Sequence, residues 1–188
     1  MNFPPRSFAA RIRQGLLALV LSAAGMLPAD LRAGIELIPN DKFADDGTSW
    51  KFFADKGATA EMSVEKVDNE PALCVTVTAT DEESEPSPEN VVNVRVQRLF
   101  GEISADARYH VRFKAKAETD AGIVSFISPE KESARVLWRT VLKLDSGWKE
   151  FAFDITARDT ADQCVFGFAR LGGITNKYWF KDIVLTVD

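Results

Sequence analysis

Short runs of alternating apolar and polar residues follow one another along most of the chain. From Gly34 onward there are about ten such runs, and none has the period of a long helix. Turn-forming stretches such as DDGTS, DSG and LGGITN separate them. The runs are IELIP, AEMSVEKV, ALCVTVTAT, VVNVRVQRLF, RYHVRFKAKAE, GIVSFIS, RVLWRTVLKL, WKEFAFDIT, CVFGFARL and YWFKDIVLTV. Because successive side chains of a strand point to opposite faces, this pattern predicts an all-β protein, an antiparallel β-sandwich of about ten strands.

The alternation also separates two faces on single strands. In VVNVRVQ the valines point one way, whereas Asn93, Arg95 and Gln97 point the other way. Buried polar groups need hydrogen-bond partners, so we expect this polar set on a face away from the core. In CVFGFARL the pattern leaves the core face open, because either its two phenylalanines or its aliphatic residues fit it.

The last run changes parity in its middle. In a regular strand Tyr178 and Phe180 share one face, whereas Ile183 and Leu185 share the other. A β-bulge at Lys181–Asp182 adds one residue and brings all four apolar side chains to the core. We therefore predict a bulge there, which leaves the tryptophan of this run facing outward.

Residues 1–33 have the build of a cleaved secretory signal. Arg6, Arg11 and Arg13 precede Gly15–Leu27, an uncharged and mostly apolar run of 13 residues. This run is short for a bilayer-spanning helix, which needs about 20 residues. We expect residues 34–188 to form one exported domain, in the periplasm or outside the cell. A retained membrane anchor is the alternative.

The balance of charge argues against two classes of partner. The whole chain has a net charge of −5, and without residues 1–33, which hold four Arg and one Asp, the net charge is −8. An acidic surface disfavours nucleic acid and anionic lipid as partners. We expect no membrane contact after signal cleavage, and a monomer.

Two cysteines, Cys74 and Cys164, are the only candidates for a disulfide. An exported protein meets an oxidising compartment, which favours a bridge. Packed sheets lie about 10 Å apart, which is too far for a bridge unless the two strands come close. The pairing therefore stays open.

Catalytic motifs are missing from the sequence. His110 is the only histidine, and no nucleophile motif accompanies it. LGG reads as a turn rather than as a phosphate-binding loop. We therefore do not expect an enzyme.

The order of several motifs resembles that of a known family. NDKF with Trp50, then VQRLFGEISADARYHVRFKAKAE, GWKEFAFDIT, FARLGG and WFKDIVL follow one another along the chain. This order resembles the CenC-like carbohydrate-binding modules attached to bacterial cellulases and xylanases, over nearly all of residues 35–188. The resemblance implies a galactose-binding-like jelly roll that binds polysaccharide or oligosaccharide without catalysis, here as a secreted stand-alone module. The alternative is a structural or protein-interaction module that has lost sugar binding, because no catalytic domain is attached.

A sugar site needs an aromatic face that stacks on a pyranose ring and planar polar side chains that bond its hydroxyls. The polar strand face supplies the second part, although it also fits ordinary surface polarity. The resemblance implies that Trp138 supplies the first part, on the same sheet face as the polar set, although a tryptophan in a strand is often a core residue. The predicted ligand-binding residues are Asn93, Arg95, Gln97, Trp138, Arg139 and Arg170.

The resemblance also implies a structural calcium ion. In many relatives the carboxylate that matches Asp182 binds calcium together with backbone oxygens and an acid beside the opening phenylalanine. In this chain that neighbour is Ala44, followed by Asp45 and Asp46. Asp182 is therefore the predicted calcium ligand. The alternative, which Ala44 favours slightly, is that Asp182 caps the bulge or pairs with a lysine.

Overall fold

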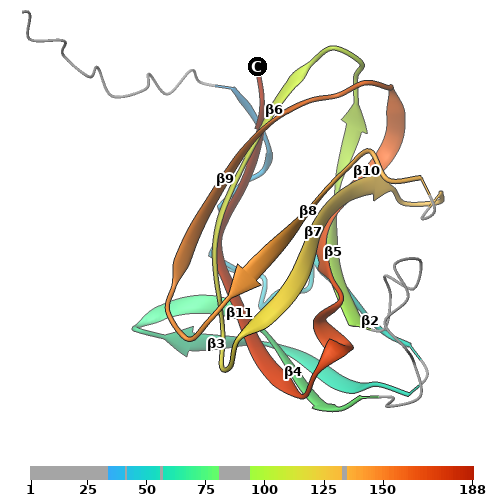
Figure 1. Cartoon of the computed structure of the whole chain (residues 1–188). Coiled ribbons are helices and arrows are strands. Elements are labelled where there is room, and N and C mark those ends of the chain that lie inside the picture. The colour runs from blue at the N-terminus through green and yellow to red at the C-terminus, as the bar shows by residue number, and fades with distance from the viewer. Residues whose placement is uncertain (1–33, 41, 56, 81–93, 133–134) are drawn as a thin grey trace, which may run out of the picture. The chain divides into compact units, whose positions relative to one another are not determined.

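Eleven β-strands make up the computed structural model, which describes residues 34–40, 42–55, 57–80, 94–132 and 135–188. The prediction of an all-β protein built from two antiparallel sheets is confirmed (Figure 1). The described part of the chain contains no helix that is long and apolar enough to cross a membrane. The predicted signal, residues 1–33, lies outside the described residues.

Sheet A has six strands. β3, β4, β11, β6 and β9 lie side by side in this order, and β1 pairs with the end of β11. Between β3 and β4, both residues of the two-residue turn, Asp68 and Asn69, have positive φ, which is the geometry of a tight hairpin. The strands of sheet A are β1 Ile35–Ile38, β3 Thr59–Val67, β4 Glu70–Ala79, β6 Arg108–Ala117, β9 Lys149–Thr156 and β11 Asn176–Val187.

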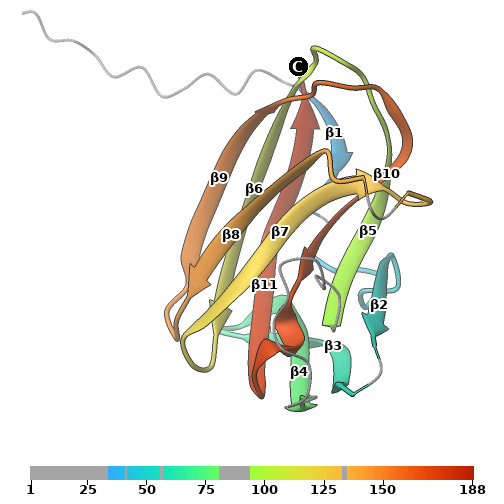
Figure 2. The same ribbon diagram turned by 45° about the vertical axis from the view of Figure 1, so that its right-hand side comes forward.

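Sheet B has five strands in the order β2, β5, β10, β7, β8, which Figure 2 shows running side by side. A short 3-10 turn, Leu171–Gly173, joins β10 to the loop that leads into β11. The strands of sheet B are β2 Trp50–Ala54, β5 Val94–Ile103, β7 Ala121–Pro129, β8 Trp138–Leu144 and β10 Ala161–Ala169.

The core between the sheets is built around aromatic rings. Phe168 of sheet B stacks on Phe180 of sheet A with ring centres 4.0 Å apart, and its ring meets that of Phe113 edge-on at 5.0 Å. All three side chains are fully buried. Each such side chain contributes about 1.5–3 kcal/mol of hydrophobic free energy on burial, so this contact holds the two sheets together.

Both faces of β10 are buried, which explains why its alternation could not be read. Phe166 and Phe168 belong to the core between the sheets. Val165 and Ala169, on the opposite face, are 1% and 2% exposed and belong to a second apolar cluster. The outer face of sheet B is therefore partly apolar.

The predicted bulge in β11 is confirmed. β11 pairs regularly with β6 up to Lys181, and the register then shifts before Val184. Asp182 has φ 54°, in the left-handed region. Tyr178 and Phe180 before the shift and Ile183 and Leu185 after it are all buried in the core. The extra residue thus lets both halves of the strand face the same way.

The two cysteines are not bridged. Cys164 belongs to the core side of sheet B, whereas Cys74 pairs in register with Trp179 and lies on the outer side of sheet A. Burial raises the pKa of the Cys74 thiol to about 11. Sheet A separates the two thiols, so the geometric argument against a disulfide prevails over the expectation from an exported protein.

The left-handed backbone at Asp182 can be tested with two substitutions. Asp182→Gly and Asp182→Val both remove the carboxylate, but only glycine adopts positive φ without steric cost. We expect the valine variant to be less stable than the glycine variant by about 1–2 kcal/mol in urea denaturation. Equal unfolding free energies of the two variants would contradict the bulge geometry.

Candidate functional site

One row of residues crosses the outer face of sheet B from edge to edge. Gln97 of β5 pairs in register with Lys51 of β2 and with Gly167 of β10. Gly167 pairs with Phe126 of β7, which in turn pairs with Arg139 of β8. The residues before and after Gly167 belong to the core between the sheets, so this row faces away from that core. We call this face, with the residues flanking the row, the outer face of sheet B.

An apolar floor lies in the middle of this face. Its members are Val124, Phe126, Val165 and Ala169, all less than 8% exposed. Two exposed aliphatic side chains continue it, because Leu99 pairs in register with Val165 and Val141 pairs with Val124. Leu99 is 43% exposed and Val141 is 66% exposed, so the floor reaches solvent on both sides.

Gly167 is required at the centre of the row. A Cβ atom at this position would lie 2.4 Å from the carbonyl oxygen of Val96 and 2.9 Å from the Cβ of Gln97. Both contacts are shorter than real Cβ atoms show, and one of them is with backbone. Glycine therefore allows the close approach of β5 and β10 and leaves no side chain between Gln97 and Phe126.

Two polar side chains on this face have atoms without a partner. Gln97 is only 4% exposed, and its Oε1 accepts no hydrogen bond from any described residue. Arg95 places its guanidinium 4.4 Å from the ring centre of Phe53, and its buried Nε likewise donates to no described residue. Buried polar atoms are normally satisfied because leaving one unpaired costs about 1–3 kcal/mol. These atoms are therefore suited to a ligand that carries both hydrogen-bond donors and acceptors.

Three of the predicted site residues share this face. Arg95, Gln97 and Arg139 come from β5 and β8 and all point away from the core. Asn93 lies outside the described residues. Arg170 follows β10 with φ 62°, where it precedes the 3-10 turn, and its side chain is half-buried.

The prediction that Trp138 shares the face of Arg95 and Gln97 is wrong. Trp138 pairs in register with Ile127, a core residue, and its ring lies 5.2 Å from that of Phe153 in sheet A. It is half-buried and packs against the core from the start of β8. The core tendency of a strand tryptophan therefore prevails over the position that the resemblance implied.

Sequence reasoning missed Phe53, Phe126 and Gly167. Phe126 lies in GIVSFIS, where both faces of the strand are apolar, so alternation gives no signal for its side. Gly167 was hidden by the same ambiguity in β10. A glycine between two core phenylalanines was the available signal, because it marks a close approach of two backbones.

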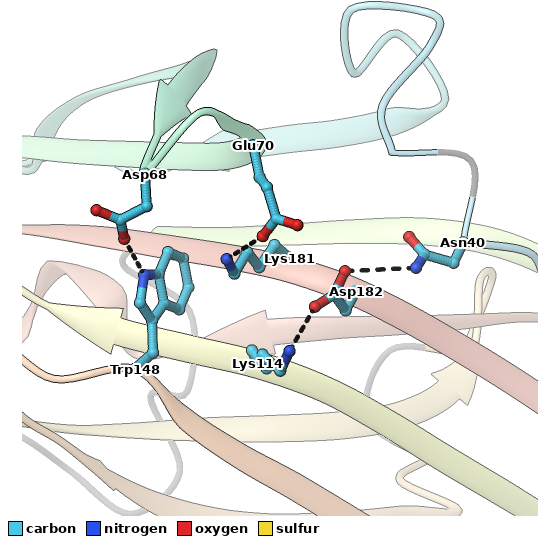
Figure 3. Close-up of polar contacts among 7 residues, drawn as sticks. All are labelled: Asn40, Asp68, Glu70, Lys114, Trp148, Lys181 and Asp182. Carbon is cyan, nitrogen blue, oxygen red and sulfur yellow. Dashed lines mark hydrogen bonds and ion pairs between the residues drawn. The ribbon is translucent and has the colours of Figure 1, made fainter.

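Asp182 is engaged by two neighbours at the bulge (Figure 3). Lys114 Nζ lies 2.9 Å from its Oδ2, and Asn40 Nδ2 donates to its Oδ1 at 3.4 Å. Burial opposes ionisation of Asp182, but the hydrogen bond and charge of Lys114 outweigh it, and they hold the pKa of this carboxyl below its usual value.

The described residues around Asp182 do not fit a calcium ion. Calcium takes six to eight oxygens, but an ammonium group already lies against one carboxylate oxygen of Asp182. Asp45 accepts hydrogen bonds from the backbone N–H groups of Gly47 and Ser49 and from the hydroxyl of Thr48. No group of three or more acidic, His or Cys side chains that could hold a metal occurs in the described part of the chain. The geometry matches the lysine-pairing alternative.

The outer face of sheet A carries two tryptophans, and lysines cover both. Trp148 donates from Nε1 to Asp68 at 2.9 Å, and Lys181 lies 4.6 Å from its ring centre while pairing with Glu70 (Figure 3). Lys116 lies 5.0 Å from the ring centres of both Trp148 and Trp179.

Trp179 faces outward, as expected, and donates from Nε1 to Glu65, which also pairs with Lys177. Lys177 lies 5.4 Å from the ring centre of Trp179, in addition to the contact with Lys116. Cations on the rings and carboxylates on the indole N–H groups form a closed network on this sheet. These rings are therefore a poor platform for stacking a sugar.

His110 is held between two carboxylates on sheet A. Its Nδ1 lies 2.7 Å from Asp154 and its Nε2 lies 3.2 Å from Asp188. Hydrogen bonds first to Asp154 and then to Asp188 raise the pKa of the imidazole. Only the protonated ring can donate from both nitrogens, so this arrangement suits an ion pair better than a catalytic base.

Several solved structures have a similar fold. A family 4 carbohydrate-binding module (CBM4) is 21% identical with a TM-score of 0.60, and the match covers 82% of this chain and 95% of that one. The N-terminal cellulose-binding domain of β-1,4-glucanase C from Cellulomonas fimi is 21% identical with a TM-score of 0.54, covering 77% and 92%. An arabinose-bound α-L-arabinofuranosidase is 12% identical with a TM-score of 0.59, covering 81% of this chain but only 26% of that longer one.

At these identities the structural matches establish the fold, a β-sandwich of the kind found in carbohydrate-binding modules. No protein-family model and no curated protein sequence matches this chain.

The lysine at the bulge predicts the response to metal removal. Because Lys114 already neutralises Asp182, we expect a chelator to leave the melting temperature of the wild type unchanged. The measurement is thermal unfolding followed by circular dichroism, with and without EDTA. A drop in melting temperature that added calcium reverses would show that calcium binds.

The raised pKa of His110 predicts a pH dependence of stability. The folded protein binds this proton more tightly than the unfolded chain, whose histidine pKa is about 6.5. The contribution is therefore complete below about pH 6.5 and is lost as the pH rises through the folded pKa. The side chain is 38% exposed, so the effect stays below about 1 kcal/mol.

We expect the melting temperature of wild type, relative to His110→Gln, to decrease between about pH 6 and pH 9. Parallel pH profiles of the two proteins would contradict the ion-pair assignment.

Proposed function

We propose that this protein is a non-catalytic carbohydrate-binding module, which takes a polysaccharide or oligosaccharide on the outer face of sheet B. The observation that carries the proposal is the buried Oε1 of Gln97, which lies beside Gly167 in the row that leads to Phe126 and has no donor among the described residues. A sugar hydroxyl is a donor of the right kind for it.

The chemistry of the face suits a carbohydrate. Carbohydrates combine apolar C–H surfaces with hydroxyl groups, and the face combines an apolar floor with Gln97 and Arg95. Glycine at position 167 places no side chain between Gln97 and Phe126, and Leu99 and Val141 bring the floor to solvent at its two sides. The hydroxyls then bond the amide and the guanidinium, while the floor contacts the C–H groups.

The fold comparisons support the same class of function by analogy. Two of the similar structures are a family 4 carbohydrate-binding module and a cellulose-binding domain, and each is nearly covered by this chain. A shared fold does not by itself imply a shared function. The proposal therefore depends on the site, and the fold is supporting evidence only.

Export is part of the proposal. The basic residues ahead of the apolar run Gly15–Leu27 support a secretory signal, and a polysaccharide ligand outside the cell would require it.

A protein-interaction module is the second candidate, and one observation favours it. Trp138, the aromatic platform expected from the sequence, packs inward against Phe153. Phe53 is half-buried beneath Arg95, and Phe126 is only 7% exposed. The apolar floor with its exposed edges at Leu99 and Val141 would also suit a protein partner. The two candidates differ in whether soluble polysaccharides bind to this face.

The substitution Gln97→Leu separates binding from stability. It removes the unpartnered oxygen and keeps the side chain of similar size, so we expect folding stability equal to or above that of the wild type. Affinity for a polysaccharide should fall about tenfold or more, because the ligand loses its acceptor in a buried site. The measurements are affinity electrophoresis on a panel of neutral and acidic soluble polysaccharides, and urea denaturation.

Arg112→Gln is the matched control, because Arg112 is exposed on sheet A. The control should bind like the wild type. If no polysaccharide retards the wild type, the proposal is wrong. It is also wrong if Gln97→Leu and Arg112→Gln bind the same polymer as tightly as the wild type.

A further inference from the structure

The outer face of sheet B differs in charge from the rest of the molecule. The whole chain has more acids than bases, 28 against 23. The row Lys51, Gln97, Gly167, Phe126 and Arg139 contains two basic residues and no acid.

The residues flanking the row continue this pattern. On one side of the row, the flanking residues add one base, Arg95, and no acid. They are Phe53, Arg95, Ala169, Val124 and Val141. The acids of β5 and β10, Glu102 and Asp162, lie beyond the register shifts at the far end of these strands. Glu130, which follows β7, pairs with Lys51 at the edge of the row. The centre of this face is therefore basic on an acidic protein.

Two arginines of this face form no ion pair with a described residue. Arg139 is exposed at the edge of the row, and no ion pair of it with a described residue occurs. The Nε of Arg95 has no acceptor in the described part of the chain, and its guanidinium is oriented by the ring of Phe53. Lys51 is different, because Glu130 already pairs with it. Lys143 lies on the same side as Arg139, four residues further along β8, and is exposed.

The spacing of the arginines indicates the size of the ligand. Arg95 is on β5 and Arg139 is on β8, three strands away across sheet B. Neighbouring strands lie about 4.7–4.9 Å apart, so their backbones are roughly 14 Å or more from each other. Two arginines on strands this far apart offer two separate positions for carboxylates. A chain that carries a carboxylate on several of its rings can reach both.

We infer that the ligand is an acidic polysaccharide, a chain of uronic acid residues laid across the strands of sheet B. Its carboxylates pair with the guanidinium groups of Arg139 and Arg95, its rings lie on the apolar floor, and a hydroxyl donates to Gln97. Guanidinium groups bind carboxylates through two parallel hydrogen bonds, which gives such a site selectivity as well as affinity. This inference rests on the proposed function and adds to it the class of sugar.

The experiment compares one polymer with its uncharged form. Isothermal titration calorimetry is run on the wild type with polygalacturonate and with the same polymer after its carboxyl groups have been reduced to alcohols. The chain length and backbone are then matched, and only the charge differs. We expect about tenfold tighter binding of the charged polymer at low salt, and a loss of this preference at high salt because the ion pairs are screened. Galacturonic acid monomer should bind far more weakly than oligomers.

Variants locate the charge effect on this face. Arg139→Gln should weaken polygalacturonate binding about fivefold, Arg95→Gln should weaken it at least as much, and Arg139→Gln should weaken binding of the reduced polymer much less than that of polygalacturonate. Arg139→Lys should recover part of the loss, because it keeps the charge without the planar fork. Arg112→Gln on sheet A removes the same charge elsewhere and should have no effect.

Four results would overturn the inference. Equal affinity for the charged and reduced polymers, with Gln97→Leu impaired for both, would leave the proposed function intact and remove the acidic selectivity. Equal losses in Arg112→Gln and Arg139→Gln would place the charge effect outside this face. Binding of no polymer would remove the proposed function itself.

The fourth result concerns the chain's own acidic stretch. A variant with Asp81, Glu82, Glu83, Glu85 and Glu89 changed to amides is measured beside the wild type. If only that variant binds polygalacturonate, the partner of the basic face is this stretch, and the inference is wrong.

Discussion

The fold depends on one extra residue in its most central strand. β11 lies between β4 and β6, and it supplies Tyr178 and Phe180 to the core from one half and Ile183 and Leu185 from the other. A regular strand would turn one of these pairs to solvent. The left-handed Asp182 removes that conflict, and Lys114 and Asn40 hold its side chain. With both halves facing inward, Phe180 can stack on Phe168 and hold the second sheet in place.

The two outer faces that result have different properties. On sheet A, lysines lie over Trp148 and Trp179, and carboxylates accept from their indole N–H groups, so the polar and aromatic groups satisfy one another. On sheet B, Gln97 and Arg95 keep unpaired atoms beside an apolar floor. Unsatisfied buried groups cost stability, and Ser49, Trp50 and Ser125 carry such atoms as well. What distinguishes Gln97 and Arg95 is their place on the outer face, beside the apolar floor. The proposed binding site therefore lies on the outer face of sheet B.

Much of the fold, and part of the candidate site, could be predicted from the sequence where the alternation of apolar and polar residues was clear. The position of Arg95 and Gln97 away from the core and the bulge at Asp182 both followed from the period of two. The pattern failed where both sides of a strand are apolar, as around Phe126 and Gly167, because hydrophobicity alone cannot then tell the core from an outer floor. It also failed at Trp138, the first residue of β8, whose ring packs on Phe153 of the other sheet, a contact between residues distant in sequence.

The central claim is that carbohydrate binds to the outer face of sheet B. A titration followed by the NMR chemical shifts of backbone amides tests this claim most directly. A ¹⁵N-labelled sample is titrated with oligosaccharides of the polymer that binds best, and shift changes are assigned to residues. The account predicts the largest changes at Gln97, Gly167, Phe126 and Arg139, on four adjacent strands. Changes centred on Trp148 and Trp179, with the row on sheet B unaffected, would contradict it.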